Sequence, residues 1–210
     1  MMHSLPVLLG LMVLALTTAG QENHAETLSI QLHRGTPLEE RGREQLHRLL
    51  HTHDLRKWLF TRDVLIQSGV IPHSHPVLTL NTYYLDDDTA QLATFVHEQI
   101  HWFLTDQVGH AQTNAAVSEL RELYPQAPTA PPEGARDAWS TYLHLLVCTL
   151  ELQALTELLG EPSARQQLTR WTHYTWVYRT VLTDTEKIAD LVRRHGMMVP
   201  ERESGVEQSR

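Results

Sequence analysis

The sequence predicts a mainly helical α+β fold in a single domain, with a small β-sheet ahead of one apolar helix. The chain has 210 residues, of which 41% are hydrophobic, and this length suits one core and is short for two. Apolar residues recur at helical spacing through most of the second half. Short β-favouring runs, broken by glycine and proline, fall within residues 64–81.

The first helix is expected to begin at "TPLEERGREQLHRLL". Thr36 is a candidate N-cap, Pro37 suits the first helical position, and the leucines that follow lie on one face. Two short strands are expected near 64–67 and 77–81.

Further helices are expected along the rest of the chain. Three aspartates at 86–88 supply caps for a helix that runs to about Leu104. A shorter amphipathic helix is expected at 113–124, followed by the proline-rich loop "PQAPTAPPEG". A long, mostly apolar helix then ends at Gly160, and two or three more helices follow up to about His195.

The two ends of the chain have their own character. Residues 1–20 resemble a signal peptide, because the apolar run is too short to span a bilayer and ends in small residues. Cleavage near Gly20 predicts a secreted or periplasmic protein with no membrane attachment afterwards. Residues 21–35 are expected to be a polar leader, residues 36–198 the folded domain, and residues 199–210 a disordered tail.

Charge and cysteine content narrow the classes of function. A net charge of −8 gives no broad basic surface, so nucleic acid is not an expected partner. Cys148 is the only cysteine, so an exported form has no internal disulfide and depends on its core or on a metal.

The segment "TFVHEQIHWFL", residues 94–104, carries the main functional signal. His97 and His101 are four residues apart and therefore project from one helix face, where two imidazoles can hold one zinc ion. Glu98 lies beside them and can take a proton from a water molecule bound to the metal. Burying these polar groups in an apolar helix is costly, and a metal ion with its water satisfies all three.

Zinc needs a third protein ligand. A histidine six residues after His101 is excluded because that position is Gln107, and Leu104 stands where the same motif has glycine. Asp106 falls on the opposite helix face, and His110 lies beyond Gly109.

The segment "HLLVCTLELQAL" offers better donors on one helix face. Glu151 is expected to be the third zinc ligand, because an acid inside an apolar helix needs a partner. His144 is expected to contact the ligands without binding the metal, and Cys148 to be a buried thiol. A core acid paired with arginine or tyrosine is the alternative for Glu151.

With "HEQIH" and a later glutamate helix, the chain resembles gluzincin-type zinc metallopeptidases, a class of zincins. The resemblance covers roughly residues 64–180 and implies a zincin-like domain that hydrolyses peptide bonds, with Glu98 as general base. It also implies that "VLTLNT" is an edge strand that pairs with an extended substrate. The sequence departs from the pattern at Leu155, where many members have aspartate.

The resemblance further implies a tyrosine or histidine that stabilises the transition state. Tyr178 is the first candidate, and His173 and Tyr174 remain open; Tyr174 and Tyr178 are expected to share a helix face. Arg179 could meet a substrate carboxylate or only water.

Two other interpretations stay open. The chain could be a non-catalytic, zinc-stabilised binding protein, or a helical secreted protein with no metal. The expected substrate of a peptidase here is a peptide or a protein. His73 and His75 in "IPHSHPV" are expected to be ordinary imidazoles in a proline-bracketed turn, with a second metal site as the alternative.

Overall fold

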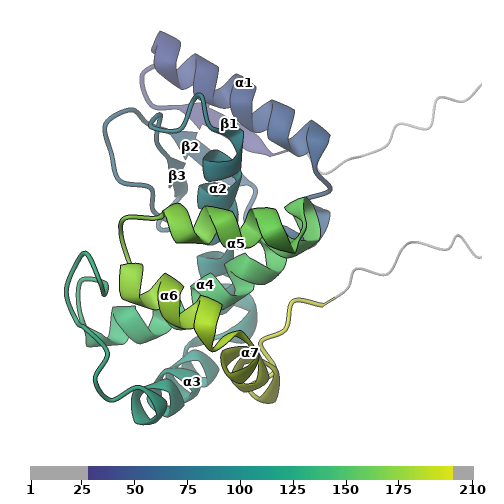
Figure 1. Cartoon of the computed structure of the whole chain (residues 1–210). Coiled ribbons are helices and arrows are strands. Elements are labelled where there is room, and N and C mark those ends of the chain that lie inside the picture. Colours follow the sequence, from purple (N-terminus) through teal and green to yellow (C-terminus); the bar gives the residue numbers. More distant parts are fainter. Residues whose placement is uncertain (1–27, 201–210) are drawn as a thin grey trace, which may run out of the picture.

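The computed structural model describes residues 28–200, so the predicted signal peptide and most of the predicted tail lie outside the described residues. Figure 1 shows the sheet and α1 at one end of the molecule and α3, α6 and α7 at the other. The prediction of a mainly helical fold with a small sheet ahead of the motif helix is confirmed.

The strands are β1 (Ser29–Leu32), β2 (Asp63–Ile66) and β3 (Leu78–Leu80). The α-helices are α1 (Pro37–Thr52), α2 (Asp88–Trp102), α3 (His110–Leu123), α4 (Ala138–Leu159), α5 (Glu161–Arg170), α6 (Thr175–Thr183) and α7 (Thr185–Arg194), with a 3₁₀ turn η1 (Arg56–Trp58) and a π-helix η2 (Phe103–Val108).

The sheet has three parallel strands in the order β1-β2-β3. The sequence predicted β2 and β3 but not β1, which lies inside the segment 21–35 expected to be a polar leader. Its four residues alternate between exposed and half-buried positions, and its pairing with β2 joins residues more than 30 positions apart. The folded domain therefore begins before residue 36, and at its other end Val199 is buried in the core.

The helix α1 begins with the predicted cap. The Thr36 hydroxyl accepts a hydrogen bond from the Glu39 backbone N–H, and the Glu39 carboxylate accepts one from the Thr36 N–H, which is a capping box. The same carboxylate also accepts backbone N–H groups of Arg34 and Ser68. One side chain thus joins the start of α1 to the segments that follow β1 and β2.

One hydrophobic core runs through the described residues, and α4 lies at its centre. This helix packs against α2, α3, α5, α6 and α7. By length and composition α4 could cross a membrane, but most of its side chains are buried within the protein, as in the core helix of a globular domain. The ends of α4 agree with the sequence, since Asp137 caps its start and Gly160 follows its last residue with φ of 83°.

The motif helix does not end as a plain α-helix. After Trp102 the chain continues as the π-helix η2, and the Thr105 hydroxyl donates to the His101 carbonyl over 2.9 Å. The π-turn ends at Gly109, whose φ of 87° reverses the chain into α3. Short π-helices are frequent next to functional sites.

We predict that Glu39→Gln lowers the free energy of unfolding at pH 7 by about 1.5–3 kcal/mol, because an amide cannot accept three backbone N–H groups as a carboxylate does. Burial raises the pKa of Glu39, but the bonds from Arg34, Ser68 and Thr36 outweigh it and lower that pKa. The carboxylate therefore stabilises the fold above its unfolded pKa of about 4.3, and this contribution is lost as the pH falls through the lower folded pKa.

Urea denaturation of both proteins between pH 3 and pH 7 measures this effect. Glu40→Gln is the matched control, because Glu40 lies next to Glu39 but is partly exposed and forms a surface ion pair with Arg43. Equal losses in the two variants, or a difference between wild type and Glu39→Gln that grows towards pH 3, would contradict the prediction.

Candidate metal centre

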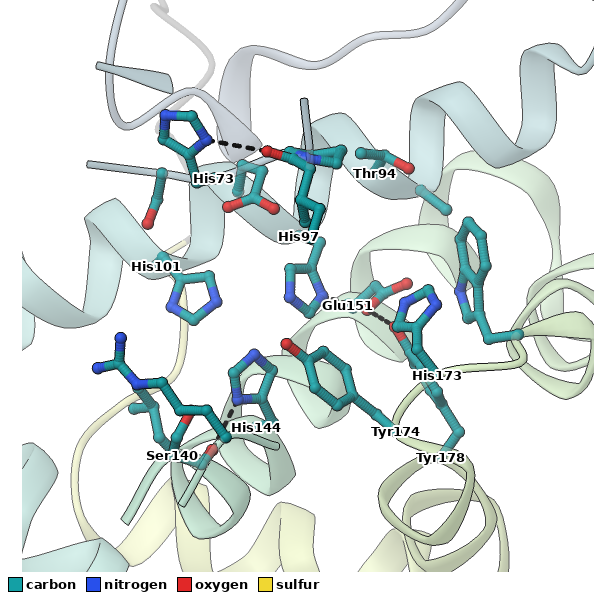
Figure 2. Close-up of a pocket in the computed structure, with 18 of the residues that line it drawn as sticks. His73, Thr94, His97, His101, Ser140, His144, Glu151, His173, Tyr174 and Tyr178 are labelled. Carbon is teal, nitrogen blue, oxygen red and sulfur yellow. Dashed lines mark hydrogen bonds and ion pairs between the residues drawn. The ribbon is translucent and has the colours of Figure 1, made fainter. Parts of the chain in front are cut away.

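Three histidine side chains from two helices converge at one point in the core. His97 and His101 project from α2 and His144 from α4, and Figure 2 shows their rings around a common space. One nitrogen of each ring lies within 4.8 Å of the other two. The ring centroids are 5.1 Å apart for His97 and His101, 5.5 Å for His97 and His144, and 5.1 Å for His101 and His144.

Helical spacing explains this convergence. His97 and His101 are one turn apart on α2, so they face α4 together. On α4, His144, Cys148 and Glu151 follow at intervals of four and three residues and share the face turned towards α2. The predicted stripe of donors on this helix therefore faces the motif.

Hydrogen bonds fix two of the rings. The Nδ1–H of His144 donates to the Ser140 carbonyl over 2.6 Å, and Nδ1 of His97 lies 2.8 Å from Oε2 of Glu151. Because a carbonyl and a carboxylate accept these bonds, Nδ1 carries the proton in each ring and Nε2 is left for another partner. Proteins commonly hold metal-binding histidines in this way.

Glu151 lies behind His97 rather than beside His101. Its carboxylate is fully buried, and Oε2 also accepts the Tyr178 hydroxyl over 3.1 Å. Glu151 does not join His97 and His101 in a common group of closely spaced ligand atoms, whereas His144 does. The geometry therefore favours an exchange of the roles predicted for Glu151 and His144.

Glu151 also forms a second possible group with His97 and Cys148. Burial and then the Glu151 charge raise the pKa of the Cys148 thiol well above its usual range. The sulfur is therefore protonated at neutral pH, and a thiol is a far weaker metal ligand than a thiolate. Cys148 fits the predicted role of a buried thiol.

The electrostatics of the cluster suit a cation. Burial, together with the neighbouring imidazoles, lowers the pKa of His101 well below its usual value and that of His144 to about 3. Burial also opposes a charge on His97, but the bond to Glu151 outweighs it and raises that pKa. His101 and His144 are thus neutral, the form that binds metals, and the ring of His101 has no hydrogen-bond partner among residues 28–200, although it lies against the rings of His97 and His144.

Glu98 lies in the same cavity as the three rings. Only 7% of its surface is exposed, and burial raises its pKa to about 7, although the charges of His97 and His73 partly oppose this. The cavity has a volume of about 740 Å³, within the usual range for a small-molecule or peptide site. Its walls come from α2, α4, the segment 171–178 and the loops 71–75, 81–84 and 131–136.

Tyr174 and Tyr178 do not share a helix face as predicted. Tyr178 is buried within α6 and donates to Glu151, so it contacts the carboxylate behind His97. Tyr174 precedes α6 and has a left-handed backbone with φ of 50°. The centroid of its ring lies 4.2 Å from the centroid of the His144 ring. In Figure 2 its hydroxyl points towards the histidines. The cavity also includes His173, which is exposed.

The loop before α4 holds Tyr174 in this position. The carbonyls of Pro132 and Glu133 accept the N–H groups of Thr175 and Trp176 at the start of α6. Gly134 allows the tight path of this loop, because a Cβ there would lie 2.2 Å from the Pro128 carbonyl oxygen. A left-handed residue that is not glycine is uncommon and often marks a functional site.

Other candidate residues lie away from the cluster. Asp106 and His110 are exposed beyond α2, as is Gln107, and neither Asp106 nor His110 belongs to a potential metal-binding group among the described residues. Arg179 is exposed and does not line the cavity.

The segment 71–76 forms a wall of the cavity and covers the edge of β3. The backbone of His73 pairs with Thr79 in both directions, so the expected substrate edge of β3 is already paired at this residue. His75 stacks on Trp102 with ring centroids 4.2 Å apart, and Trp102 donates to the Ser74 carbonyl. Neither His73 nor His75 belongs to a potential metal-binding group among the described residues.

Comparison of the chain with known protein families, with curated proteins and with solved structures gives no match.

We predict that His144→Ala abolishes retention of zinc, while Glu151→Gln weakens binding about 10- to 100-fold, as expected for a group that orients a ligand. Cys148→Ala is the matched control from the same face of α4 and should leave binding unchanged. Competition with a chromogenic chelator measures the affinity, and circular dichroism checks that each variant is folded. If Glu151→Gln loses all zinc and His144→Ala retains it, the ligands are those predicted from the sequence, with Glu151 as the third.

Proposed function

We propose that this protein is a zinc-dependent metallopeptidase. The observation that carries the proposal is that the imidazoles of His97, His101 and His144 converge next to the buried carboxylate of Glu98, and that all four side chains line one cavity. His97, His101 and His144 would hold the ion through Nε2, and the cavity side would leave the fourth position open. Burying three adjacent imidazoles with few hydrogen bonds is unfavourable, and a bound cation removes that cost.

When bound, zinc would polarise the substrate carbonyl and lower the pKa of a water molecule towards about 7. Glu98 lies next to His97 in the chain and lines the same cavity, so its carboxylate can accept a proton from that water and pass it to the leaving amine. The Tyr174 hydroxyl is aimed at the same space and can donate a hydrogen bond to the carbonyl oxygen as it becomes negative. Tyr174 therefore replaces Tyr178 as the candidate for this role.

The order of elements supports a zincin-like arrangement, with a small sheet, then the motif helix, then a later helix, α4, that would supply the third ligand. Two features differ from the expectation drawn from the resemblance. All three strands are parallel, and the residue that forms a possible metal-binding group with His97 and His101 is His144 rather than a glutamate. Export through a signal peptide at residues 1–20 remains part of the proposal.

A purely structural zinc site is less well supported. Structural sites usually take a fourth protein ligand and exclude water. Here all three histidines line the cavity, together with Glu98, Tyr174 and His173. These groups have a use in hydrolysis and none in a closed structural site.

We predict that Glu98→Gln lowers kcat about 10²- to 10⁴-fold on a fluorogenic peptide library, because the amide cannot accept a proton. Zinc content should stay at the wild-type level. Thr94→Ser, a mild change one turn before Glu98 on the cavity wall, serves as control. Peptide cleavage by Glu98→Gln at the wild-type rate would exclude the general-base role.

We also predict that Tyr174→Phe lowers kcat about 10²- to 10³-fold with little change in KM or zinc content, since the hydroxyl acts on the transition state. Tyr178→Phe should instead weaken zinc binding, because it removes a hydrogen bond to Glu151. Steady-state kinetics and a zinc titration of each variant distinguish the effect of Tyr174→Phe from that of Tyr178→Phe. If Tyr178→Phe loses turnover at full zinc occupancy and Tyr174→Phe does not, the first candidate from the sequence is right.

A further inference from the structure

The cavity wall contains one permanently charged cation. Arg136 is the one arginine or lysine among the described residues that line it. The acidic groups in the lining are Glu98 and Glu151, and both are buried near the histidines. In a chain of net charge −8, Arg136 places a cation on the cavity wall, paired on one side with the half-exposed carboxylate of Asp137.

The guanidinium is available for a ligand. Its one hydrogen bond within the described residues runs from Nε to Asp137 over 3.3 Å, and 82% of the Arg136 side chain is exposed. Nη1 and Nη2 have no partner there. The backbone beneath it is fixed, because Ala135 donates to the Thr141 hydroxyl and Asp137 caps α4. A planar fork on a rigid base suits bidentate binding of a carboxylate.

Arg136 is also at a useful distance from the proposed reaction centre. It lies two residues before Ala138, the first residue of α4, and the helix rises about 9 Å from Ala138 to His144 at 1.5 Å per residue. Because an extended peptide advances about 3.3–3.6 Å per residue, a group held by Arg136 would lie within about three residues of the bond to be cut.

We infer that the cavity selects peptides that carry a carboxylate close to the scissile bond, and that Arg136 binds this carboxylate. The inference rests on the proposed function and names its substrate class. The carboxylate is either the free C-terminus of the peptide or an aspartate or glutamate side chain. Arg136 takes the role that the sequence suggested for Arg179, which lies outside the cavity.

Binding and cleavage of three matched peptides test this inference. The first peptide is neutral with a free C-terminus, the second is its C-terminal amide, and the third is the amide with one internal glutamate. Dissociation constants are measured by fluorescence anisotropy on zinc-loaded Glu98→Gln protein, with Arg136→Gln and Arg179→Gln added separately to that background. Cleavage of the same peptides is measured with wild-type protein.

We expect at least one carboxylate peptide to bind about five- to tenfold more tightly than the neutral amide. Arg136→Gln should remove this preference and Arg179→Gln should keep it. High salt should weaken the preference, because the Debye length falls to about 3 Å at 1 M. Preference for the first peptide identifies the C-terminal carboxylate, and preference for the third identifies an acidic side chain.

A preference that is absent, or that persists in Arg136→Gln, overturns the inference, as does failure of every peptide to bind. An Arg136-dependent preference without any cleavage by the wild-type protein would overturn the proposed peptidase activity instead and leave the carboxylate site in place.

Discussion

The hydrogen bond between His97 and Glu151 is the interaction on which the arrangement of the core depends. It joins α2 to α4 across the middle of the protein, with a fully buried carboxylate on one side. Breaking a buried pair by removing one partner typically costs about 3–5 kcal/mol, because a charge is left without compensation. Tyr178 adds a second donor from α6, so three helices share this carboxylate.

This bond also sets the chemistry of the site. It fixes the proton of His97 on Nδ1 and leaves Nε2 for another partner, in a ring whose centroid lies 5.1 Å from that of His101 and 5.5 Å from that of His144. The Ser140 carbonyl does the same for His144. A site prepared in this way needs little rearrangement to bind a metal ion, since both rings are already oriented.

The rest of the fold supplies the walls. The segment 71–76 is attached to β3 by His73 and to the end of α2 by Trp102. The loop 130–135 is attached to α6 by two backbone bonds, which hold Tyr174 in its left-handed conformation. The small sheet and α1, joined by Glu39, form the base on which α2 lies.

Local rules predicted much of this protein from the sequence. Spacing placed His97 and His101 on one face, and the capping pattern located the start of α1. Three features depend on contacts between distant segments and could not be read in this way. The strand β1 is defined by its pairing with β2. The packing of α2 on α4 decides that His144 lies beside His101 while Glu151 lies behind His97. The conformation of Tyr174 depends on backbone carbonyls about 40 residues earlier in the chain.

The most direct test of this account is a crystal structure of the zinc-loaded protein with anomalous data collected on both sides of the zinc absorption edge. The account predicts one anomalous peak per chain, about 2.0–2.1 Å from Nε2 of His97, His101 and His144, with Glu151 still bonded to Nδ1 of His97. A peak bound by Glu151 or Cys148 in place of His144, or no peak at these histidines, would contradict it.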